Sequence, residues 1–150
     1  MQTIFPILRY RDARAAIQWL CEAFGFVELF CVPEQGPYVR HARLGLGPNM
    51  IMLGSVRPDD GIESPQALGA ATQMLAVYVP DPDAHFERAR TAGAKILAAP
   101  NDTDFGSREY HVLDLEGHPW TFGTFQPRSL ADEGVDEDRN TVTEPEKKKG

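Results

Sequence analysis

The sequence matches itself when it is shifted by 69 positions, and the match between its two halves needs no gap. Several of the matched pairs are identical: Asp12 and Asp81, Ala15 and Ala84, Leu44 and Leu113, Leu46 and Leu115, Gly54 and Gly123. Other matched pairs are apolar on both sides: Ile17 and Phe86, Leu20 and Ala89, Ile51 and Trp120, Leu53 and Phe122. A repeat at a fixed period indicates copies of one supersecondary unit. We therefore expect two similar modules in tandem.

Each half has the pattern of a strand, a helix and three further strands. In the first half we predict strands at residues 3–10, 26–32, 38–46 and 49–54, and a helix from the capping Asp12 to Phe24 that ends at Gly25. In the second half we predict strands at residues 73–79, 95–99, 107–115 and 118–125, and a helix from Asp81 or Asp83 to about Ala92. The predicted fold class is α+β, with two tandem βαβββ modules that form a curved mixed sheet, or cup.

The two modules together predict one domain at residues 1–125. We place them at about residues 1–54 and 72–125, joined by a connector at residues 55–71 that is rich in Pro, Gly and Asp. Residues 126–150 are densely charged and lack aromatic side chains. Such a segment cannot bury enough apolar surface to offset the entropy of ordering, so we predict a flexible charged tail.

Composition and charge argue against several classes of protein. The formal net charge of −7 disfavours a nucleic-acid-binding surface. No apolar run is long enough to cross a bilayer and the start of the chain lacks an export signal, so we expect a cytoplasmic protein with no membrane contact. The two cysteines, Cys21 and Cys31, are expected to be free thiols.

Alternation along the strands assigns side chains to the two faces of the predicted sheet. The helices must cover one face, which the aliphatic Leu75, Val77 and Val79 mark. The opposite face then carries our candidate ligand-binding residues: Phe5, Arg9, His41, Arg43, Met52, Met74, Tyr78, Arg108, Tyr110 and Thr121. The apolar and aromatic members would line the cup with an adaptable surface, and the arginines and His41 would give it positive potential. The same alternation places His111 beneath the helix.

The histidines show no metal-binding pattern in the sequence, because no CxxC, HExxH or HxH spacing occurs. We expect His85 on a helix surface, and we expect His118 to fix the turn after Gly117. His41 is the one histidine that we place in the cup, either as a ligand contact or as a structural hydrogen-bond partner.

The paired modules, the helical stretch RDARAAIQWLCEAFGF and the stretch GSREYHVLDLEGHPWTFGTF resemble the glyoxalase/bleomycin-resistance/dioxygenase family, also called the vicinal oxygen chelate superfamily. The likeness covers residues 1–125 and is most specific at Gly106 to Phe125, where a D-x-x-G-H-x-W run is similar to a bleomycin-resistance or glyoxalase-like branch. The resemblance implies a cup at or beside the interface of two paired chains, so we expect a homodimer.

Enzymes of this superfamily hold a divalent metal in the cup through His, Gln or Glu from the first, fourth, fifth and eighth strands. Carried over one at a time, those positions fall on side chains that suit a metal poorly: Phe5, Met52 or its neighbour, Met74 (Gln73 if the register slips by one) and Thr121. A phenyl ring cannot ligate, and a thioether or a lone hydroxyl is a poor ligand for hard divalent ions. We therefore predict no metal and no cofactor.

The leading hypothesis is a metal-free protein that sequesters an aromatic or amphipathic small molecule in the cup, as antibiotic-binding members of the family do. The alternative is a metal-dependent lyase, isomerase or dioxygenase whose displaced site uses Gln73, His41 and either Glu28 or Glu109. A third possibility is an interaction module that acts through its acidic tail. The sequence leaves open whether any reaction is catalysed, and it favours binding without chemistry.

Overall fold

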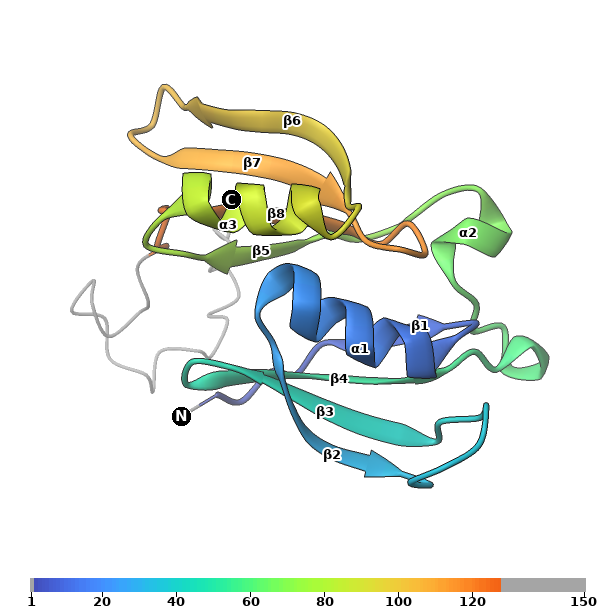
Figure 1. The fold of residues 1–150 in the computed structure, drawn as a ribbon. Coiled ribbons are helices and arrows are strands. Elements are labelled where there is room, and N and C mark those ends of the chain that lie inside the picture. Colours follow the sequence, from blue (N-terminus) through green and yellow to red (C-terminus); the bar gives the residue numbers. More distant parts are fainter. Residues whose placement is uncertain (1, 128–150) are drawn as a thin grey trace, which may run out of the picture.

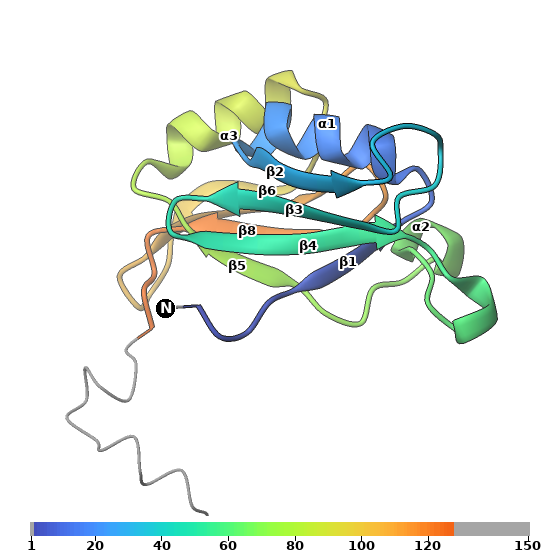
Figure 2. The same ribbon diagram turned by 90° about the horizontal axis from the view of Figure 1, so that it is seen from below.

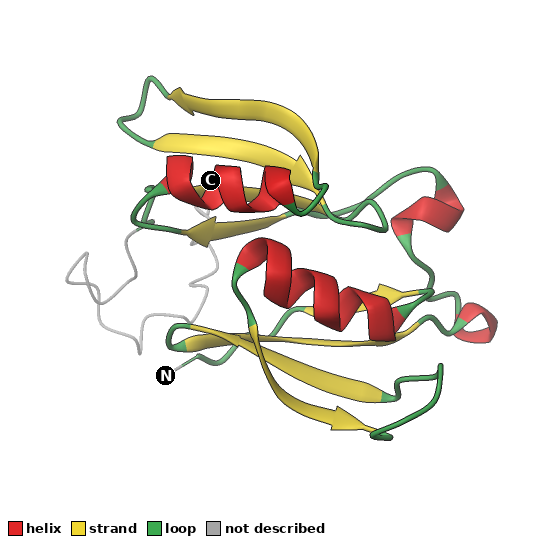
Figure 3. Cartoon of the chain, in the orientation of Figure 1, coloured by secondary structure: helices red, strands yellow, loops and turns green. Residues whose placement is uncertain are grey.

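The computed structural model of the chain describes residues 2–127, so the predicted tail lies outside the described residues apart from Gln126 and Pro127. The first module comprises strand β1 (Ile7–Tyr10), helix α1 (Ala13–Phe24) and strands β2 (Val27–Val32), β3 (His41–Leu46) and β4 (Asn49–Ser55). The second comprises strand β5 (Leu75–Tyr78), helix α3 (Pro82–Thr91) and strands β6 (Lys95–Asp102), β7 (Arg108–Leu113) and β8 (Pro119–Gly123). The predicted order of two βαβββ modules is confirmed (Figures 1 and 3).

The connector contains two short elements, a 3₁₀ turn at Pro58–Asp60 and helix α2 at Pro65–Leu68. Each ends at a glycine in the left-handed region, Gly61 and Gly69, which is a common way to stop a helical turn. Among the described residues, no helix is both long and apolar enough to cross a membrane.

The repeated residues have repeated structural roles at the start of each long helix. The Asp12 carboxylate accepts a 3.0 Å hydrogen bond from the backbone amide of Ala15, and the Asp81 carboxylate accepts one of 3.1 Å from Ala84. These bonds satisfy amides that have no partner within the helix. The self-match of the sequence thus reflects, in part, two identical N-caps.

Each module forms its own four-stranded mixed sheet, with the strand orders β1-β4-β3-β2 and β5-β8-β7-β6. The first strand of each module pairs in parallel with the last, and the remaining pairs are antiparallel. The strands β1 and β5 each lie at an edge of their sheet, where one side of the backbone has no neighbouring strand within the described chain.

The two helices pack against each other where the two modules meet (Figure 1), and Figure 2 shows both of them along the same side of the strands. One buried core contains side chains from both sheets and both helices, among them Leu20 and Phe24 of α1, Ala89 of α3 and Trp120 of β8. We call the face of each sheet that no helix covers its open face. The helix-covered faces share one core, and the open faces lie on the outside of it. The open faces belong to two separate sheets, whose strands do not pair with each other within the described chain.

The register of β7 differs from the prediction by one residue. Gly45 pairs with Met50 across the β3–β4 turn, which encloses residues 46–49, whereas Leu113 pairs with Pro119 across a turn that encloses residues 114–118. The second turn is one residue longer, so the offset between the modules falls from 69 to 68 in β7. A slip of one residue exchanges the two faces of a strand.

The predicted orientations of Arg108, Tyr110 and His111 are therefore wrong. Tyr110 is fully buried beneath α3 and has no exposed area. His111 and Glu109 lie on the open face in its place, since they alternate with the buried Tyr110 and Val112.

Candidate functional site

The open face of the first sheet carries the predicted cationic side chains. Arg9 donates from Nη1 to the backbone oxygen of Ser55 at 3.2 Å. The Arg43 guanidinium lies 4.5 Å from the centre of the Phe30 ring, a cation–π contact that fixes its plane. The Nε of Arg43 is buried and has no hydrogen-bond partner among the described residues. His41 lies beside Phe30 on the same face, with the ring centres 6.0 Å apart.

Apolar side chains lie between these cations and also stand on the second sheet. Met52 is partly exposed on β4, and Phe5 lies just before β1. On the second module, Met74 is 59% exposed and Tyr78 is 48% exposed. Their predicted places on the open faces agree with the structure, and so does that of Thr121 on β8. Within residues 2–127, no helix covers these apolar groups.

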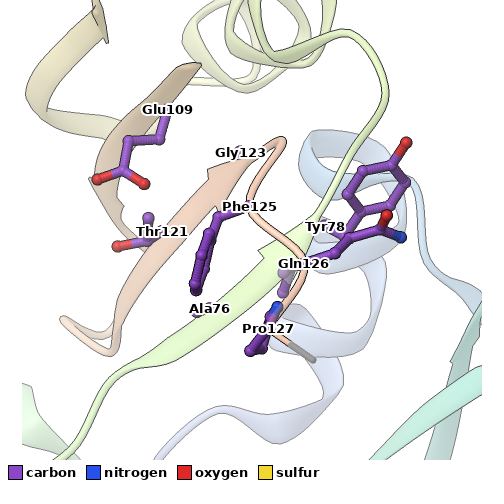
Figure 4. Close-up of a pocket in the computed structure, with 9 residues that line it drawn as sticks. Ala76, Tyr78, Glu109, Thr121, Gly123, Phe125, Gln126 and Pro127 are labelled. Carbon is purple, nitrogen blue, oxygen red and sulfur yellow. The ribbon is translucent and has the colours of Figure 1, made fainter. Parts of the chain in front are cut away.

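A cavity of about 420 Å³ lies on the open face of the second sheet, where the chain from Phe125 to Pro127 crosses β5 and β8 (Figure 4). Ala76, Tyr78 and Thr121 form part of its wall. In Figure 4, Glu109 and Thr121 lie on one side of the Phe125 ring, and Tyr78 and Gln126 lie on the other. Its volume lies within the range of about 300–1,000 Å³ that is typical of small-molecule sites.

A second cavity, of about 750 Å³, lies where β5 faces the N-terminal segment and the start of β4. Its wall includes Ile4, Met50, Leu75 and Trp120, and none of the described residues that line it is charged. Tyr78 lines both cavities, so it stands at the boundary between the open face and the seam of the two modules.

Three polar side chains form a chain of contacts beside the first cavity. The His111 Nδ1 lies 2.7 Å from the Thr121 hydroxyl, and its Nε2 lies 3.5 Å from a carboxylate oxygen of Glu109. A constant offset of 69 between the modules places Glu109 on the helix side, so it was not predicted as a wall residue. The alternation of Glu109 and His111 with Tyr110 and Val112 is the signal that could have found it, since it is the pattern of a half-buried strand.

The side chains of Arg108 and Tyr110 have partners on the helix side of the sheet. Arg108 makes ion pairs of 2.7 Å with Asp83 and 3.1 Å with Asp102, and these carboxylates raise its pKa. The Tyr110 hydroxyl contacts Nδ1 of His85, while Nε2 of His85 lies 3.0 Å from the backbone oxygen of Phe24. A carbonyl only accepts, so Nε2 carries the proton and Nδ1 accepts from Tyr110. His85 is thus a half-buried structural residue between the modules, and its expected place on a helix surface is wrong.

The described residues do not fit a divalent metal. The positions that match the superfamily's metal ligands hold Phe5, Met52, Met74 and Thr121, and the first two belong to the first module and the last two to the second. No group of three His, Cys, Asp or Glu side chains within residues 2–127 is arranged to hold a metal ion. The displaced set is not assembled within residues 2–127, since His41 lies on β3 of the first sheet and Glu109 on β7 of the second, and no metal-binding group includes them.

Comparison with known proteins agrees with this fold. Residues 3–122 match the sequence model of the Glyoxalase/Bleomycin resistance protein/Dioxygenase superfamily. The chain belongs to this superfamily. Uncharacterized protein Mb0911c of Mycobacterium bovis is 35% identical over 121 residues, which cover 79% of this chain and 80% of that protein.

Solved structures of the superfamily fold are also similar. TioX from Micromonospora sp. ML1 is 34% identical, with a TM-score of 0.67, and the match covers 85% of this chain and 99% of TioX. A glyoxalase-related enzyme from Fulvimarina pelagi has a TM-score of 0.60 at 19% identity, over 83% of this chain and 89% of that one. The second likeness concerns the fold alone.

The run that most specifically marks the superfamily in this chain, Asp114 to Trp120, forms the joint between its modules. The Glu116 carboxylate accepts hydrogen bonds of 2.6 and 2.9 Å from the backbone amides of Arg11 and Asp12. His118 lies with Nε2 2.8 Å from the backbone oxygen of Arg9. The motif therefore holds the start of α1 against the second module. It does not line the first cavity, and it contributes only Trp120 to the wall of the second.

Proposed function

We propose that this superfamily member binds a small aromatic or amphipathic molecule on its open sheet faces and holds it without chemical change. One observation carries the proposal: the positions that supply metal ligands in superfamily enzymes hold a phenyl ring, two thioethers and a hydroxyl (Phe5, Met52, Met74 and Thr121). Methionine and aromatic side chains repack around varied ligands, so this surface suits binding better than metal chemistry.

The roles of the side chains follow from their placement. The apolar body of the ligand would contact Met52, Met74 and Tyr78. Arg9 and Arg43, on the first sheet, would meet an anionic group, and the unpartnered Nε of Arg43 supports that role. Arg108 and Tyr110 are left out of the proposed site, because both face the helix side and already have partners there.

We also propose that a second copy of the chain covers the open faces and completes the cup. The open faces expose Ile7, Met74 and Tyr78 to solvent, and surfaces of this kind mark interaction sites. The two faces have complementary charge, since the first carries Arg9 and Arg43 and the second carries Glu109. A first sheet of one copy against a second sheet of another would bury the apolar groups between these charges. The unpaired edges of β1 and β5 support the same arrangement.

The experiment that tests the proposal is metal analysis by plasma mass spectrometry, followed by ligand screening with a thermal-shift assay. The full chain is purified without a metal-affinity tag or a chelator. We expect less than about a tenth of an equivalent of any transition metal, because tight sites copurify with their metal. We also expect at least one aromatic compound of the screen to raise the melting temperature.

The control is a Met52→Ala, Tyr78→Ala double variant, which should keep its melting temperature without ligand and lose the shift. Near one equivalent of metal per chain would contradict binding without chemistry and favour the metal-dependent lyase, isomerase or dioxygenase. Free thiols at both Cys21 and Cys31 fit a cytoplasmic protein, which is the compartment that we propose.

A further inference from the structure

Among the described residues, a single charged side chain lies in the wall of the cavity on the open face of the second sheet. Glu109 provides that charge, and the other lining residues are apolar or neutral (Figure 4). The Glu109 side chain is only 15% exposed, whereas that of His111 beside it is 35% exposed. A carboxylate that has lost much of its water gains more from an incoming cation than one on an open surface does.

The backbone around Gly123 leaves room for this carboxylate. Glu109 and Gly123 are direct cross-strand neighbours in β7 and β8. A Cβ added at Gly123 would lie 2.6 Å from the Cβ of Glu109 and 2.9 Å from the backbone oxygen of Arg108. Any larger residue would displace the strand that carries Glu109. The glycine is therefore needed for Glu109 to lie in the cavity wall.

The contacts of His111 determine the group to which the Thr121 hydroxyl donates its proton. A carboxylate accepts hydrogen bonds, so Glu109 favours the imidazole proton on Nε2, which lies 3.5 Å from it. Nδ1 then has a free lone pair and accepts the Thr121 proton at 2.7 Å. The oxygen of Thr121, which lines the cavity, keeps its lone pairs as acceptors. Both polar groups that Glu109 and Thr121 present to a ligand are therefore acceptors.

No arginine of the described chain neutralises Glu109. The adjacent Arg108 turns to the helix side, where Asp83 and Asp102 hold it. Within residues 2–127, the contact with His111 is the only ion pair of Glu109, and it requires a protonated imidazole. The carboxylate is thus available to a cation that comes from outside the chain.

We propose that this cavity recognises a protonated amine carried on an aromatic or aliphatic body. The ammonium group donates to the Glu109 carboxylate and to the Thr121 hydroxyl oxygen, and the apolar body packs against Ala76 and Phe125. The inference rests on the proposed function, because it names the chemical class of a ligand for the same open face. It also gives the second sheet a negatively charged site for a cation, whereas the first sheet carries positively charged arginines.

The test compares three probes with the same ring system and different charge: 2-(aminomethyl)naphthalene, 2-naphthalenemethanol and 2-naphthoate. Each is titrated into the full chain at neutral pH, and naphthalene fluorescence reports the dissociation constant. We expect the amine to bind about tenfold more tightly than the alcohol, and the naphthoate to bind more weakly than the amine. High salt should reduce the advantage of the amine, because the carboxylate retains some exposure.

The variant Glu109→Gln keeps the shape of the side chain and removes its charge. We expect it to bind the amine and the alcohol equally within about twofold, because the amine loses its charged partner. Glu87→Gln is the matched control, since it removes one negative charge on the exposed side of α3, and it should keep the preference for the amine. Thr121→Val is a second variant, which should lose part of the preference through the missing acceptor.

The outcomes separate this inference from the proposed function. If the alcohol binds wild-type protein as tightly as the amine, or if Glu109→Gln keeps the preference, the inference is overturned and the binding function stands. If Glu109→Gln weakens self-association and leaves the ranking of the probes unchanged, Glu109 serves a contact between copies and the inference is again overturned. If none of the three probes binds, both the inference and the proposed function are contradicted.

Discussion

The hydroxyl of Tyr10 donates a 2.7 Å hydrogen bond to Oδ2 of Asp114, which lies 104 residues further along the chain. Both residues are buried at the joint between the modules. Asp114 also accepts from Nε1 of Trp120 and from the backbone amides of Glu116 and His118. Burial raises the pKa of Asp114, and these donors work against that rise. One buried carboxylate thus organises the joint that aligns both sheets around the helices.

Loss of the Tyr10 hydroxyl should destabilise the protein. In Tyr10→Phe the ring still fills its place, but Asp114 loses a buried donor, and hydrogen bonds to charged groups contribute about 1.5–3 kcal/mol. We expect a lower free energy of unfolding by that amount in urea denaturation. The control is Tyr38→Phe, because the Tyr38 side chain is half exposed, and it should change stability by less than about 0.5 kcal/mol. Equal effects of the two changes would contradict the role of Asp114.

His85 should make stability depend on pH in the mildly acidic range. Burial lowers its pKa from the usual 6.5, and the nearby Arg88 adds to this effect. As pH falls below about 6.5, the imidazole therefore binds a proton in the unfolded chain but not in the folded chain. The free energy of unfolding decreases as a result, until the pH reaches the pKa of the folded state. The variant His85→Gln should show a shallower decrease over this range.

The measurement is a series of urea unfolding curves from neutral to mildly acidic pH for wild type and His85→Gln. The slopes of stability against pH are compared, because the variant also loses the contact with Tyr110 and so starts from a lower value. Above the usual imidazole pKa, the two slopes should coincide. If the variant had the same slope as wild type below the usual imidazole pKa, other groups would be the cause of the pH dependence.

The parts of the fold that depend on local chemistry could be predicted from the sequence. The matched Asp12 and Asp81 cap the two helices, and Ile51 and Trp120 occupy equivalent buried positions on β4 and β8. The gapless match failed in β6 and β7, where the offset between the modules is 68, and the β7–β8 turn, which is longer by one residue, restores the offset of 69. This slip placed Tyr110 on the wrong face and kept Glu109 out of the predicted site.

The arrangement of the modules could not be predicted in the same way. Both helices are amphipathic, and the sequence indicates which of their faces are buried but not which sheet or helix covers them. Trp19 of α1 donates to the backbone oxygen of Ala92 at 3.0 Å, and Arg88 of α3 donates to those of Cys21 and Glu22 at 3.1 and 2.8 Å. These contacts link residues far apart in the chain, and no periodicity in the sequence indicates them.

Substitution of Gly123 should be costly although the residue has no side chain to lose. In Gly123→Ala the new Cβ would meet the Cβ of Glu109 and a backbone oxygen at distances below 3.0 Å. Overpacking against backbone costs about 1–3 kcal/mol, which we expect to measure as lost stability in urea. The control is Gly45→Ala, where the nearest atom is the end of the Leu29 side chain at 3.1 Å. That side chain can rotate away, so the control should lose less, and an equal loss would argue against tight packing at Gly123.

A charge placed on the open face of the first sheet should prevent the proposed pairing of two chains. Ile7 is 51% exposed in the single chain, so Ile7→Glu should leave the fold intact and bury an unpaired carboxylate only if a second copy covers this face. Such burial costs several kcal/mol, which corresponds to a loss of dimer affinity on the order of a hundredfold or more. Sedimentation velocity should find a dimer for wild type and a monomer for Ile7→Glu. Leu68→Glu, on α2 and away from both open faces, should remain a dimer; a monomeric wild type, or equal dissociation of the two variants, would contradict the proposal.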